Sequence, residues 1–136
     1  MNNEIKNSQL PSVAALSYLG DARYDLYVRR LLVDSGLSKS GALNRKALEY
    51  VTCEAQAASY KRIEHLLTEE EHNVFKRAFN STHLNKPKRA SGLDYRLATG
   101  FEALIGMLHW TGNEERLEFL LEKSHSIEEN QNDTEN

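Results

Sequence analysis

Apolar residues recur at helical spacing through almost the whole chain, and this pattern limits the chain to an all-α fold. No stretch alternates apolar and polar residues for long enough to indicate a strand. Pro11 and Pro87 are the only prolines that interrupt the pattern. A chain of 136 residues has the length of one domain. We therefore predict a compact helical bundle over residues 1–126.

Capping residues and helix breakers divide this bundle into six expected helices. Pro11 favours a helix start, and Gly36 favours the end of the same helix. Thr52 is placed to cap a later helix, and Thr68 with Glu71 forms a capping box. The expected helices cover residues 11–35, 40–51, 53–67, 68–79, 93–111 and 113–126. A polar, basic loop is expected at 80–91.

Charge is distributed unevenly along the chain, whose formal net charge is −3. Residues 127–136 hold four acids and no base, and we expect them to form a disordered tail. Residues 76–96 hold six Lys or Arg and a single acid, Asp94. A basic segment on a nearly neutral body is typical of a surface that binds phosphates.

Cysteine use and hydropathy indicate a cytoplasmic protein. Cys53 is the only cysteine, so the chain contains no internal disulfide and no cysteine-based zinc site. We expect Cys53 to be a small buried apolar residue. The first eleven residues lack the apolar run of a signal peptide, and no stretch approaches the ~20 apolar residues of a membrane helix.

Two helices each place an acid beside small residues. Residues 16–30 contain Asp21 after Gly20, and residues 95–110 contain Glu102 as their only acid. Small residues allow two helix backbones to approach closely. The small residues near the two acids are Gly20, Ala22, Gly100, Ala103 and Gly106. We therefore expect these helices to cross tightly and to bring Asp21 and Glu102 together.

Two adjacent carboxylates repel, so one takes a proton or a cation compensates both. Mg²⁺ commonly binds through one or two carboxylates together with substrate phosphates, which the basic segment would attract. The spacing leaves a second interpretation open, in which each acid simply pairs with a nearby arginine. The candidates for that pairing are Arg23, Arg29 and Arg96.

Two short motifs resemble those of the ribonuclease III family. The stretch "YLGDA", residues 18–22, is similar to the core of the family signature, and "FEALIG", residues 101–106, is similar to its second acidic motif. The absence of a double-stranded-RNA-binding domain resembles the mini-ribonuclease III subfamily, which consists of the catalytic domain alone. The resemblance covers residues 10 to about 126, nearly the whole chain.

This resemblance implies an all-α ribonuclease III endonuclease domain that forms a homodimer and cuts both strands of double-stranded RNA. It implies Mg²⁺ as cofactor, for which Mn²⁺ can substitute, and the large-subunit (23S) ribosomal RNA precursor as substrate. By motif, Asp21 and Glu102 are then the catalytic metal ligands. The exposed apolar residues expected on the first helix offer a surface for the second protomer.

The chain departs from full-length ribonuclease III at three positions that hold further acids there. These positions are Ala14, Ser17 and Thr99 here, and the mini subfamily resembles this chain in those losses. Fewer protein ligands per metal then leave more of its coordination to water. Phe79 also stands where that subfamily tends to have an arginine, which points to altered RNA affinity or sequence preference.

The basic segment supplies the residues that we expect to bind RNA. Basic side chains hold phosphates without reading sequence, and A-form RNA is recognised mainly by its shape. The expected RNA-binding residues are Lys76, Arg77, Asn80, Lys86, Lys88, Arg89 and Arg96. Tyr95 is placed either to position this segment or to stack on a base.

Two further residues and two alternative functions remain open at this point. Asp25 follows Asp21 by one turn, and pairing with Arg29 is favoured over a place beside the metal. His109 is expected to be a core residue rather than a catalytic one. The alternative functions are an RNA-binding module without chemistry on the same fold, and an all-α adaptor that binds acidic protein surfaces.

Overall fold

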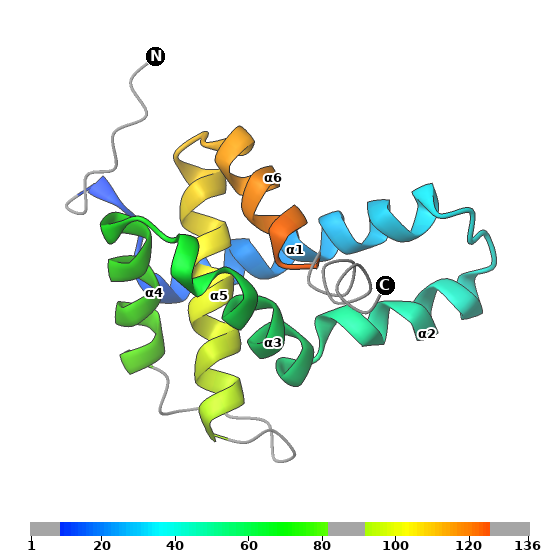
Figure 1. Ribbon diagram of the computed structural model, residues 1–136, viewed down its shortest axis with the longest axis horizontal. Coiled ribbons are helices and arrows are strands. Elements are labelled where there is room, and N and C mark those ends of the chain that lie inside the picture. The colour runs from blue at the N-terminus through cyan, green and yellow to red at the C-terminus, as the bar shows by residue number, and fades with distance from the viewer. Residues whose placement is uncertain (1–8, 82–91, 126–136) are drawn as a thin grey trace, which may run out of the picture.

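The computed structural model describes residues 9–81 and 92–125, and within them it confirms the all-α prediction (Figure 1). These residues contain helices and no strand. The helices are α1 (Val13–Asp34), α2 (Ser40–Val51), α3 (Cys53–Ile63), the short 3-10 helix η2 (Glu64–Leu66), α4 (Glu69–Ser81), α5 (Gly92–Trp110) and α6 (Glu114–Lys123). The expected tail at 127–136 lies outside the described residues.

Local capping interactions set most helix ends where the sequence predicts them. The Ser12 side chain accepts a hydrogen bond from the Ala15 amide, so α1 begins just after the predicted Pro11. Gly36 ends the turn after α1 with a φ of +100°, a backbone conformation that glycine adopts readily. The capping box is present, because the amides of Thr68 and Glu71 each donate to the other side chain, at 2.9 and 3.2 Å.

Three predicted ends differ from the structure, and one of them is the end of α6, which was expected at residue 126 and lies at Lys123. The helix expected at 53–67 ends at Ile63 and continues as η2, because Leu67 is extended just before Thr68 caps α4. Helix α4 continues to Ser81, so Asn80 and Ser81 are helical instead of belonging to the predicted loop.

Helix α5 is the central element of the bundle (Figure 1). It packs against α1, α3, α4 and α6, and ten of its residues, including Phe101, Leu104 and Met107, are buried. Helix α1 crosses it, whereas α6 folds back from its C-terminal end. No helix among residues 9–81 and 92–125 is long and apolar enough to cross a membrane.

A buried ion pair joins α4 and α6 at one end of the bundle. Arg116 donates two hydrogen bonds to Glu71, both of 2.8 Å, and a third of 2.7 Å to the Leu66 carbonyl oxygen. Burial favours a raised pKa for Glu71, but the hydrogen bonds from Arg116 and Thr68 outweigh it and lower that pKa. Glu71 therefore caps α4 and anchors α6 with one carboxylate.

Helices α1 and α2 form a hairpin that projects from the rest of the bundle (Figure 1). No residue of α2 is fully buried. Helix α1 exposes several large apolar side chains, with Tyr18 at 85%, Leu26 at 59% and Val33 at 59%. This apolar surface is available to a partner.

Candidate active site

The site is built where α1 crosses α5 backbone to backbone. A Cβ added at Gly20 would overlap the backbone oxygen of Glu102, and one added at Gly106 would overlap that of Leu16. No other residue fits at either position without separating the helices. The predicted tight crossing is therefore present, and Gly20 and Gly106 form it.

The other small residues have different places in the fold. A Cβ at Gly100 would overlap the ring of Phe75, so this glycine accommodates α4 rather than α1. Ala22 is exposed and takes no part in the crossing. Gly100 and Gly106 are six residues apart in α5, and this spacing places them on different faces of the helix. Gly106 therefore meets α1, whereas Gly100 meets α4.

The crossing brings the side chains of Asp21 and Glu102 into hydrogen-bond contact. Asp21 is exposed to solvent, whereas Glu102 is largely buried. Burial of Glu102, and next the hydrogen bond and negative charge of Asp21, raise the pKa of Glu102 to about 8. Without a cation, this raised pKa favours the protonated form of Glu102 at neutral pH, and a proton shared with Asp21 relieves the repulsion of the two carboxyl groups.

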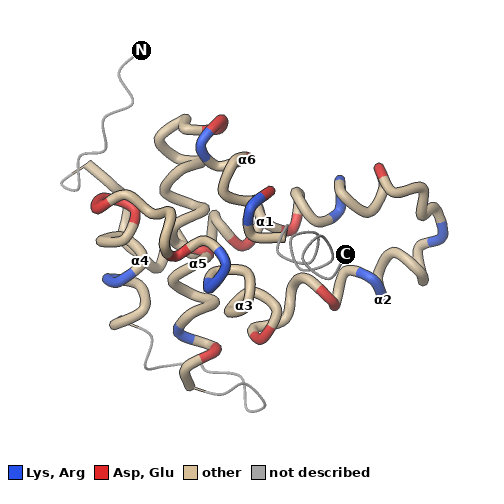
Figure 2. The backbone as a smooth tube through the Cα atoms, in the orientation of Figure 1, with Lys and Arg blue, Asp and Glu red and all other residues tan. Residues whose placement is uncertain are grey.

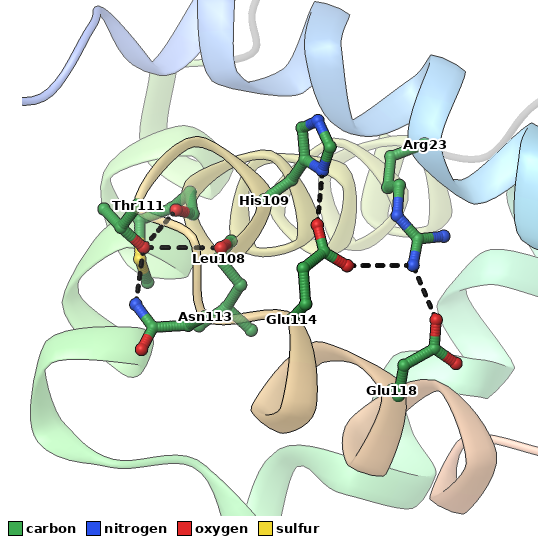
Figure 3. Close-up of polar contacts among 8 residues, drawn as sticks. Arg23, Leu108, His109, Thr111, Asn113, Glu114 and Glu118 are labelled. Carbon is green, nitrogen blue, oxygen red and sulfur yellow. Dashed lines mark hydrogen bonds and ion pairs between the residues drawn. The ribbon is translucent and has the colours of Figure 1, made fainter. Parts of the chain in front are cut away.

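The three arginines considered as partners for these acids lie elsewhere. Arg23 pairs with Glu114 and Glu118 of α6, at 3.2 and 2.7 Å, as Figure 3 shows. Arg29 pairs with Asp25 at 2.9 Å, in agreement with the favoured interpretation of Asp25. Arg96 donates to the carbonyl oxygen of Phe79. These three arginines therefore do not neutralise Asp21 and Glu102, which leaves the repulsion between the two acids to a shared proton or a cation.

Gln56 of α3 is a further member of the site that the sequence reasoning missed. It is 3% exposed and its side-chain amide lies within hydrogen-bonding reach of Glu102, which opposes part of the rise in that pKa. Gln56 is hard to recognise from the sequence, because it is a single amide among the small residues of "EAQAAS" at 54–59. Nothing in its spacing connects it to either acidic motif.

Ser17 and Thr99 occupy two of the positions that hold acids in full-length ribonuclease III, and they hydrogen-bond to backbone. The Ser17 hydroxyl donates to the Thr99 carbonyl oxygen at 3.0 Å. The Thr99 hydroxyl donates to the carbonyl oxygen of Tyr95 at 2.9 Å. The described residues contain no group of three or more His, Cys, Asp or Glu that could hold a metal ion.

The donor set at the crossing fits a hard divalent cation. Two carboxylates that otherwise share a proton supply oxygen ligands and negative charge, as Mg²⁺ prefers. Asp21 is open to solvent, so water or substrate phosphates can complete the coordination.

The predicted RNA-binding residues are only partly described. Lys76, Arg77 and Asn80 are exposed in the second half of α4, and Figure 2 shows that this helix carries basic residues. The Arg96 guanidinium instead stacks over the Phe79 ring at 4.6 Å. Lys86, Lys88 and Arg89 lie outside the described residues.

Two single-residue predictions are wrong. His109 is not a core residue, because 41% of its side chain is exposed and its Nδ1 contacts a Glu114 oxygen at 2.7 Å (Figure 3). Cys53 is only partly buried. His109 lies near the C-terminal end of α5, where the helix turns toward α6, and this position explains its exposure.

Comparison with known proteins assigns this chain to a family. The Ribonuclease III domain family matches residues 14–113. Mini-ribonuclease 3 of Streptococcus pneumoniae is 43% identical over 109 residues, which cover 79% of this chain and 85% of that protein. Mini-ribonuclease 3 of Brevibacillus brevis is 40% identical over 124 residues, which cover 91% of this chain and 92% of that protein.

A solved structure agrees with the sequence comparisons. The crystal structure of a protein from Fusobacterium nucleatum superimposes with a TM-score of 0.78 at 30% identity, covering 87% of this chain and 96% of that one. The chain therefore belongs to the ribonuclease III family. Its relatives place it in the mini-ribonuclease III group, and it is an endoribonuclease, not an adaptor or a binding module without chemistry.

Proposed function

We propose that this endoribonuclease cleaves double-stranded RNA with Mg²⁺ held by Asp21 and Glu102. The observation that carries the proposal is the contact of these two carboxyl groups at the backbone crossing of α1 and α5. Mn²⁺ has the same preference for oxygen ligands and would substitute for Mg²⁺.

Each side chain has a separate role in this proposal. Exposed Asp21 faces the solvent from which the RNA approaches, and Glu102 binds the cation once it has lost its proton. A bound Mg²⁺ supplies activation of water and neutralisation of charge on the phosphodiester. The fixed crossing holds the two carboxylates together before substrate arrives, so no reorganisation is needed on binding.

The RNA would be held mainly through its phosphates. Exposed Lys76, Arg77 and Asn80 offer two positive charges and an amide on one helix. Such contacts follow the shape of an A-form duplex without reading its sequence. The substrate class that we propose is a double-stranded part of the large-subunit (23S) ribosomal RNA precursor, processed in the cytoplasm.

A homodimer would provide the second cut. One site cleaves one strand, and a two-fold pair of sites cleaves both strands at a fixed offset. The exposed apolar side chains of α1 support a partner surface close to Asp21.

The test is cleavage of labelled duplex RNA with and without Mg²⁺. We expect the variants Asp21→Asn and Glu102→Gln to lose cleavage by at least about a thousandfold, as removal of a metal ligand requires, while they still bind the duplex. Asp25→Asn is the matched control, because Asp25 lies one turn further along α1 and pairs with Arg29. Its exposed ion pair contributes little, so cleavage should stay near the wild-type rate.

Undiminished cleavage by Asp21→Asn, or equal cleavage in the presence of a chelator, would contradict the proposal. Mapping of the products on a 23S precursor would then test the substrate separately from the chemistry.

A further inference from the structure

We propose that Gln56 is a positioning residue that holds the carboxyl group of Glu102 in the orientation required for metal binding. This inference rests on the proposed metal-dependent function. It starts from the contact between a buried amide on α3 and the site acid on α5.

The fold itself does not require an amide at this position. Gln56 is 3% exposed, and its neighbours in α3 include the buried Ala57 and Ser59. Burial of an amide costs free energy unless it is hydrogen-bonded, and an apolar side chain of similar size would avoid that cost. Among the described residues no buried side-chain nitrogen or oxygen lacks a partner, so the amide of Gln56 is satisfied where it lies.

The position of Gln56 explains how it would act. Helices α1 and α3 both pack on α5, so Glu102 has Asp21 on one neighbouring helix and Gln56 on another. A hydrogen bond from the amide to Glu102 restricts rotation of the carboxyl group and leaves its remaining lone pairs for a cation. Groups that hydrogen-bond to metal ligands in this way orient them, and their loss typically weakens metal affinity by roughly 10- to 100-fold.

The experiment measures metal binding by the full-length protein without RNA, by Mn²⁺ titration followed by electron paramagnetic resonance. We expect Gln56→Leu to raise the Mn²⁺ dissociation constant by about tenfold. With Mn²⁺ raised to saturation, the KM for duplex RNA should be unchanged, because Gln56 is buried away from the substrate. Gln56→Met, a flexible apolar replacement, serves if the leucine variant does not fold.

Ser59→Ala is the matched control. Ser59 is 2% exposed on the same helix and hydrogen-bonds to Tyr24, so its loss removes a buried hydrogen bond away from Glu102. The Mn²⁺ affinity of this variant should equal that of the wild type even if its melting temperature falls.

The outcomes separate this inference from the proposed function. Wild-type Mn²⁺ affinity in a folded Gln56 variant, with affinity lost in Asp21→Asn, would overturn the positioning role and leave the metal site in place. Mn²⁺ binding that Asp21→Asn does not change would overturn the proposed metal site, and the role of Gln56 with it.

Discussion

Burial, and next the adjacent Asp21, raise the pKa of Glu102 to about 8, well above that of a carboxyl group in water. The raised pKa means that the folded protein binds more protons than the unfolded chain between about pH 4.5 and pH 8. This contribution to stability is complete below the unfolded pKa and is lost as the pH rises through the folded value. The proposed Mg²⁺ site requires the deprotonated form, so its metal affinity should increase over the same range.

We therefore predict that the metal-free protein becomes less stable from about pH 6.5 to about pH 8. The free energy of unfolding should fall by up to about 1.4 kcal/mol per pH unit, the limit for one proton. Burial lowers the pKa of His125 to about 4, so its opposite contribution is complete below this range. Urea unfolding in the presence of a chelator measures the slope. Glu102→Gln should flatten it, and an unchanged slope in that variant would contradict the assignment.

At the level of residues, the sequence predicted the contact between Asp21 and Glu102 but not the side chains around it. Asp21 and Glu102 could be paired because each stands near a glycine in an apolar helix. Gln56 could not be found, since one amide in a helix of small residues has no distinctive spacing. The stacking of Arg96 on Phe79 depends on how α4 and α5 pack, which is not encoded in local pattern.

At the scale of the elements, the α1–α5 crossing should tolerate no added side-chain carbon. We predict that Gly106→Ala lowers the free energy of unfolding by at least about 3 kcal/mol, because the new methyl group meets backbone that cannot move without parting the helices. Thermal or urea unfolding measures the loss.

Gly92→Ala in the same helix is the control for this substitution. An added Cβ at Gly92 meets no atom within 4 Å, so the change should be neutral or stabilising by up to about 1 kcal/mol. Equal effects at the two positions would show that helix propensity, rather than the crossing, decides the result.

Element boundaries were largely predictable because they depend on nearby residues. Ser40–Val51 agrees with its predicted range, and the capping box at Thr68 sets the start of α4. The early end of α3 was not predictable, because it follows from the extended backbone that precedes α4. The sequence also does not reveal which helix each glycine contacts, because this depends on three-dimensional packing. Gly100, for example, contacts Phe75 of α4 and not α1.

For the whole molecule, the proposed dimer makes Tyr18 a test position. This side chain is 85% exposed on α1 and lies about one turn before Asp21. We predict that Tyr18→Ser shifts the protein from dimer to monomer, because it removes an aromatic anchor. Sedimentation velocity measures the mass. Trp110→Ser is the control, since Trp110 is 58% exposed at the far end of α5 and should leave the dimer intact.

The global features of the chain were the easiest to predict. Helical spacing and length together indicated an all-α bundle, and two short motifs indicated its family. How the RNA is held was less accessible, because Arg96 packs against Phe79 and the sequence pattern does not reveal this contact.

The carboxylate of Glu71 has a consequence for how the bundle comes apart. It closes the first turn of α4 and at the same time receives Arg116 from α6. Neither helix end can open alone without breaking bonds that belong to the other. We therefore expect these two helix ends to open as one cooperative unit, with amide hydrogens that exchange together.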